Sequence, residues 1–105
     1  MAKLSLVANP TFQAKVGIPM AGEDAKPVPV MLTFKHRTKS QLTEWLNSRQ
    51  GKDDAESFLD MVSAWDLEDE FKKENIELLL ENYAGTAREV LNVYVDQLFK
   101  AKLGN

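Results

Sequence analysis

The spacing of apolar residues changes near His36, and this change limits the possible folds more than any other feature. From Phe12 to Ile18, and again from Val28 to His36, apolar side chains alternate with others, which is typical of strands with one buried face. Beyond Arg37 the apolar residues recur at helical spacing. The chain therefore predicts an α+β fold, in which an N-terminal antiparallel β-hairpin packs on a C-terminal bundle of about four helices.

The hairpin has a register that the two alternating runs define. The segment between them holds Gly22 and two flanking prolines, which is typical of a turn. Pairing Ile18 with Val28 places the apolar side chains of both runs on the same face of the sheet. Pro29 predicts an edge strand unless a bulge absorbs it, because proline has no N–H to donate to a second neighbour. Leu4–Val7 is a candidate for a third short strand.

Four amphipathic helices are expected after the hairpin. The expected ranges are Thr38 to Gly51, Asp53 to Trp65, about Lys73 to Tyr83, and about Thr86 to Leu103. Thr38 and Gln41 have the spacing of a capping box at the start of the first helix. The length predicts a single domain over 1–105, with a hairpin region at about 1–37 and a helical region at about 38–105.

Composition excludes several kinds of chemistry. The 105 residues include no cysteine and one histidine, so disulfides, thiolate zinc sites and histidine-dependent nucleophiles are not expected. The net charge of −3 is unevenly divided, because thirteen of the sixteen acids follow residue 52. An acidic helical half repels phosphate backbones, so nucleic acid is not an expected partner. No apolar stretch is long enough to span a membrane, and a cytoplasmic protein is expected.

The densest acidic run, Asp66 to Glu70, is a candidate for a metal or catalytic site. Its alternating acids resemble the first ligands of a calcium loop, but Phe71 stands where that loop needs glycine for its sharp turn. Carboxylates in acid/base catalysis need an environment that separates their pKa values, and the sequence gives no sign of one. We therefore expect no metal, no cofactor, no catalytic residue and no enzymatic activity.

The last expected helix carries two apolar stripes. The main stripe consists of Ala87, Val90, Leu91, Tyr94 and Leu98. The second stripe consists of Val95, Phe99 and Leu103. In a small domain the second stripe either widens the buried face or stays exposed as a partner-binding surface, and both outcomes stay open here.

Two segments resemble phage tail assembly chaperones. One is Trp-Asp-Leu-x-Asp-Glu-Phe at 65–71, and the other is Asn-Tyr-x-Gly-x-Ala at 82–87. The residues that carry the resemblance most specifically are Trp65, Asp66, Leu67, Asp69, Glu70, Phe71, Asn82, Tyr83 and Gly85. The similarity covers about Val28 to Leu103, and Ala84 stands where the family often has proline.

The resemblance implies a binding function without turnover. Such chaperones hold the tape measure protein, and keep its apolar helical surface from aggregating until tail tube subunits replace them. The implied partner is thus the tape measure protein, with the major tail tube protein and a second copy of the chain as further candidates, in the host bacterial cytoplasm. A structural neck or tail-completion protein of the virion is the alternative, since it can share the small size and the lack of catalytic residues.

Overall fold

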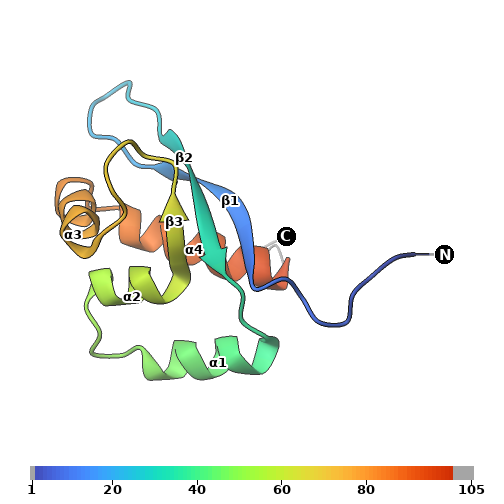
Figure 1. Cartoon of the computed structure of the whole chain (residues 1–105). Helices are drawn as coiled ribbons and strands as arrows, with labels where there is room; N and C mark the ends of the chain where they lie inside the picture. The colour runs from blue at the N-terminus through green and yellow to red at the C-terminus, as the bar shows by residue number, and fades with distance from the viewer. Residues whose placement is uncertain (1, 101–105) are drawn as a thin grey trace.

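The computed structural model describes residues 2–100, which form one sheet and four helices (Figure 1). The elements are β1 (Thr11–Ile18), β2 (Val28–Lys35), α1 (Lys39–Ser48), α2 (Asp54–Met61), β3 (Val62–Trp65), α3 (Lys73–Asn82) and α4 (Thr86–Phe99). The three strands are antiparallel and follow the order β1-β2-β3 across the sheet. The predicted α+β class is therefore confirmed.

The β1–β2 hairpin has the register that the alternating pattern predicts. Ile18 pairs with Val28, and Phe12 pairs with Phe34. The buried side chains of both strands consequently share one face, and they are Ala14, Val16, Ile18, Val30, Leu32 and Phe34. This face forms the sheet side of the hydrophobic core.

The edge position expected for the strand that contains Pro29 is wrong, because β2 is the central strand. β3 pairs with β2 only from Leu32 to Phe34. The Met31 N–H points to the β3 side, where it donates to Asp66 Oδ1 at 3.0 Å. Since alternate residues of a strand direct their N–H groups to the same side, the nitrogen of Pro29 faces the region past the end of β3. The proline therefore interrupts no pairing in the sheet.

The third strand is not the expected segment. Leu4–Val7 is exposed and lies outside the sheet, because Pro10 O accepts a hydrogen bond from His36 N at 2.9 Å and the chain before it leads away from β1 (Figure 1). The third strand is β3, so the helix expected from Asp53 to Trp65 ends at Met61. Val62 is β-branched and fully buried, and pairing with β2 overrides the helical spacing that continues through it.

Local capping defines the helix ends that the sequence predicts well. Thr38 and Gln41 form the expected capping box of α1, and the side chain of Asp53 accepts a hydrogen bond from Glu56 N at the start of α2. Helix α3 ends one residue before the expected Tyr83. Helix α4 ends at Phe99, because Lys100 adopts a left-handed backbone conformation (φ 50°) that closes the helix. Residues 101–103 of its expected range lie outside the described residues.

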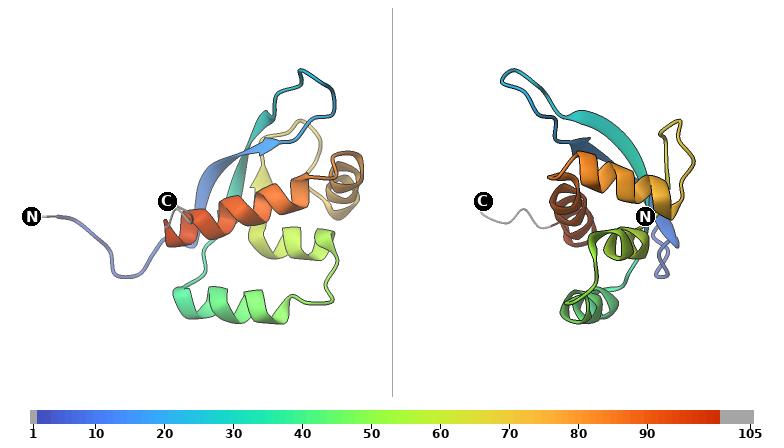
Figure 2. Two further views of the ribbon diagram at one scale, coloured as in Figure 1. Left: turned by 180° about the vertical axis from the view of Figure 1, so that it is seen from behind. Right: turned by 90° about the vertical axis from the view of Figure 1, so that its left-hand side faces the viewer.

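Helices α4 and α2 lie against the buried face of the sheet, and α1 lies beyond α2 (Figure 2). Helix α4 packs against β1, while α2, α3 and α4 contact one another. Helix α1 joins the core through Leu42 and Trp45, the buried residues on its inner face. At the centre, the ring of Tyr94 from α4 stacks on the ring of Phe34 from β2, with their centroids 5.4 Å apart.

Candidate partner-binding site

The acidic run forms the connection between β3 and α3, here called the motif loop (residues 66–72). Trp65 Nε1 donates to Asp69 O at 2.8 Å, which closes the first part of the loop. Asp66 Oδ1 accepts from the β2 backbone, and Asn75 Nδ2 donates to Glu70 O at 2.7 Å. The loop is thus fastened to the sheet at one end and to α3 at the other.

Trp65 packs against the motif loop and is half-buried. Its ring contacts Phe58 and Phe71 edge to face, with centroid separations of 6.3 and 5.1 Å. Trp65 also lines a groove, which explains its remaining exposure. Leu67 and Phe71 are also half-buried, while the acidic side chains of the loop are exposed as expected.

The two segments that carry the family resemblance meet at this groove. It encloses about 410 Å³ and is here called the motif groove. Its lining residues are Trp65, Leu67, Asp69, Asn75, Leu78, Leu79, Asn82 and Tyr83. Leu78 and Tyr83 are the most open large side chains in it, with 58% and 37% of their surface exposed. The structure therefore brings together five residues of the family pattern.

The other residues of the pattern support the fold around the groove. Asp66 accepts a hydrogen bond from the backbone of β2, and the ring of Phe71 packs edge to face against Trp65. The side chain of Glu70 is exposed. A Cβ atom at Gly85 would lie 3.0 Å from Pro19 Cγ, which is closer than normal packing allows. Glycine at this position therefore lets the α3–α4 turn approach the hairpin.

The second stripe of α4 lies in a different part of the molecule. Helix α4 starts near α3 and ends on the opposite side (Figure 1). At that end Val95 is half-buried and Phe99 is 44% exposed. Leu103, the third predicted residue of the stripe, lies outside the described residues. Val95 and Phe99 are four residues apart on one helix, and neither lines the motif groove.

A polar network that sequence reasoning missed joins β2, α2 and α4. Arg37 Nη1 donates to Asp60 O at 2.7 Å and to Tyr94 Oη at 2.9 Å. Tyr94 Oη in turn donates to Lys35 O at 2.7 Å. Burial raises the pKa of Tyr94, although the hydrogen bond and charge of Arg37 act in the opposite direction. Tyr94 therefore stays a neutral hydrogen-bond donor in the core.

Asp60 extends this network to α1. Partial burial acts to raise its pKa, but hydrogen bonds from Lys52 and Trp45 and the charges of Lys52 and Arg37 outweigh it, so the pKa is lowered. The distances to Asp60 Oδ2 are 2.8 Å from Lys52 Nζ and 2.9 Å from Trp45 Nε1. The Arg37 guanidinium also lies 4.9 Å from the centre of the Trp45 ring. These contacts fix α1 to the domain and give no sign of a reaction centre.

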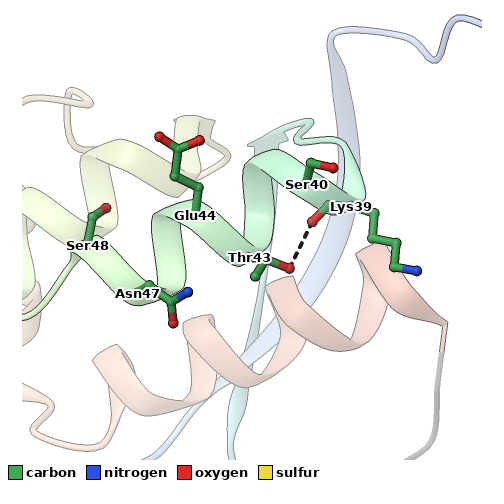
Figure 3. Close-up of a pocket in the computed structure, with 6 residues that line it drawn as sticks. All are labelled: Lys39, Ser40, Thr43, Glu44, Asn47 and Ser48. Carbon is green, nitrogen blue, oxygen red and sulfur yellow. Dashed lines mark hydrogen bonds between the residues drawn. The ribbon is translucent and has the colours of Figure 1, made fainter.

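A larger hollow lies along α1 (Figure 3). It encloses about 700 Å³ and is lined by Lys39, Ser40, Thr43, Glu44, Asn47 and Ser48. All six residues come from one helix, and the Thr43 hydroxyl already donates to Lys39 O at 3.1 Å. No second element closes the hollow, so it lacks the enclosure of a typical ligand site. Within residues 2–100, no group of three or more His, Asp or Glu side chains is placed to hold a metal ion.

A family model described as phage tail assembly chaperone matches residues 1–105, the whole chain. The chain belongs to the phage tail assembly chaperone family. Neither a curated protein nor a solved structure matches it. A tail assembly chaperone acts by binding phage tail proteins, so the motif groove and the exposed end of α4 are candidate binding sites of this chaperone. In the part of the chaperone that the structure describes, no helix is long and apolar enough to cross a membrane.

Proposed function

We propose that this chaperone binds the tape measure protein during tail assembly, in the cytoplasm of the host bacterium. In this proposal it covers apolar helical surface of the tape measure protein without catalysis, and tail tube subunits later replace it. Family membership supports the general role. The acidic helical half would keep such a complex soluble, because a net charge far from zero opposes aggregation.

The observation that carries the proposal is the exposed apolar end of α4. Val90 and Tyr94 on the same helix are fully buried, whereas Phe99 keeps 44% of its surface exposed. An amphipathic helix is recognised through apolar side chains three or four residues apart, which is the spacing of Val95 and Phe99. We include Leu103 in this proposed terminal stripe (Val95, Phe99 and Leu103) because it continues the same spacing.

The test is co-expression of the chaperone with a fragment of the tape measure protein. The variant Phe99→Asp with Leu103→Asp should fold, yet lose the ability to keep the fragment soluble and to co-purify with it. Asn47→Asp with Asn92→Asp is the matched control, because it adds the same charge at two exposed positions outside the stripe. This control should retain the fragment.

Leu98→Asp separates loss of binding from loss of folding. Leu98 is half-buried and packs against the core, so a charge there should destabilise the fold. Circular dichroism should show that Leu98→Asp is unfolded or melts at a lower temperature, whereas the double variant is folded. If the folded double variant still holds the tape measure fragment, the terminal stripe is not the binding surface. Recovery of the chain from purified virions would instead favour a structural neck or tail-completion protein.

A further inference from the structure

The motif groove combines apolar and acidic surfaces. Leu78 lies in the middle of α3 and is 58% exposed. Beside it in the groove are Trp65 and Leu79, both half-buried. An exposed leucine next to a partly open tryptophan is the kind of apolar contact on which protein interfaces are anchored.

Acidic side chains border this apolar surface on both sides. Successive residues of a helix advance by about 100°, so Glu74 and Glu81 lie on the side of Leu78 that is opposite to Asn75 and Asn82. Across the groove, Asp69 lines the wall that the motif loop provides. The apolar contact therefore runs between two acidic borders.

The segment that forms the groove has a net negative charge. Residues 66–83 contain seven carboxylates and two lysines, and all seven acidic residues are exposed. In the described part of the chain, the salt bridge is between Lys52 and Asp60, so it involves none of these seven carboxylates. Their field is thus available to a partner, and complementary charges choose partners and speed their association.

We infer that the motif groove binds a basic amphipathic helix of a tail protein. Its apolar residues contact Leu78 and Trp65, and its Lys or Arg side chains lie against the acidic borders formed by Glu74, Glu81 and Asp69. The inference rests on the proposed function only in taking the partner to be a tail protein. The motif groove is then a second binding surface, separate from the terminal stripe, and it is selective for a basic segment.

The alternative occupant of the motif groove is the N-terminal segment of a second copy of the chain. That segment carries Leu4, Leu6 and Val7 in exposed positions, and it projects from the end of the molecule opposite to α3 (Figure 1). Lys3 is its single basic residue, so it matches the acidic borders poorly. A basic helix fits the charge of the groove better, and self-association is one outcome of the test below.

The test uses two synthetic helical peptides of about 18 residues, or five turns. Both carry leucines at positions i, i+3, i+4 and i+7, with lysines at the other positions in one peptide and glutamates in the second. The probe is nuclear magnetic resonance of the two tryptophan indole N–H groups. Trp65 lines the groove, while Trp45 donates to Asp60 in the core, so the Trp45 signal serves as an internal control.

We expect the lysine peptide to shift the Trp65 signal saturably and to leave the Trp45 signal in place. Leu78→Ala should weaken this binding by about tenfold, as loss of a central apolar anchor does, whereas Leu6→Ala should not change it. Glu74→Lys with Glu81→Lys should weaken binding of the lysine peptide and strengthen binding of the glutamate peptide. An unchanged Trp45 signal shows that each variant is folded.

Three results would overturn the inference. They are equal binding of the two peptides, unchanged binding by the Leu78 variant, and a Trp65 shift caused by protein concentration alone. The last result, if Leu4→Asp with Leu6→Asp abolishes it, assigns the groove to a second copy. The titration contains no tape measure protein, so its failure leaves the co-expression test of the terminal stripe intact, and the reverse also holds.

Discussion

Tyr94→Phe tests whether the buried polar network holds the domain together. The side chain is fully buried, and its hydroxyl donates to Lys35 O and accepts from Arg37 Nη1. Phenylalanine keeps the ring that stacks on Phe34, so the change removes two hydrogen bonds and little packing. Lys35 O loses this partner, while Arg37 keeps its bond to Asp60 O at 2.7 Å.

The expected loss follows from these contacts. An unsatisfied buried acceptor costs about 1 to 3 kcal/mol, and the remaining bond of Arg37 keeps its own contribution to the loss small. We therefore expect the free energy of unfolding to fall by about 1 to 3 kcal/mol, with a decrease in Tm of roughly 4–8 °C for each kcal/mol in a domain of this size. Urea denaturation followed by circular dichroism should show a lower midpoint at an unchanged slope.

Tyr83→Phe is the matched control for this prediction. Tyr83 is 37% exposed, so removal of its hydroxyl should change the free energy of unfolding by less than about 0.5 kcal/mol. Equal effects of the two substitutions would show that the Tyr94 network does not stabilise the fold. A loss below about 0.5 kcal/mol for Tyr94→Phe would refute the reasoning in the same way.

Trp65→Ala should cost about 2 to 3 kcal/mol in denaturant unfolding, below the roughly 3–5 typical of fully buried aromatics, because the ring is half-buried. Asp66→Asn with Glu68→Gln should barely change stability, since asparagine keeps the Oδ1 that accepts from β2, and a larger loss than for Trp65→Ala would contradict this. The lowered pKa of Asp60 means that its stabilisation is present above the usual value of 3.8 and is lost as the pH falls through the lower folded value. Asp60→Asn should therefore flatten the acid limb of a plot of unfolding free energy against pH. Calorimetric titration with calcium should show no micromolar site, because Phe71 replaces the glycine of a calcium loop.

The sequence predicted features that depend on neighbours along the chain. The hairpin register followed from two alternating runs and the turn between them, which place Ile18 opposite Val28. The start of α1 followed from the short-range pairing of Thr38 with Gln41. Such local patterns determine backbone hydrogen bonds within a few residues, so they can be recognised without knowledge of the rest of the fold.

Features that depend on distant partners were not predictable in the same way. Val62 continues a helical spacing, and only the open edge of β2 makes it part of a strand. Trp65 belongs to an apolar run, but it lines a groove and its side chain stays partly exposed. Leu78 lies within the run from Leu78 to Leu80. It lies about 200° around the helix from the fully buried Ile76, and this angle was the available sign that it faces solvent.

The most direct test of the central proposal is the soluble yield of the tape measure protein when it is produced with and without this chain. The account predicts that the tape measure protein aggregates alone, becomes soluble on co-expression, and co-purifies with the chain. An equally insoluble tape measure protein in both cases, with no co-purification, would contradict the proposal that this chaperone binds it.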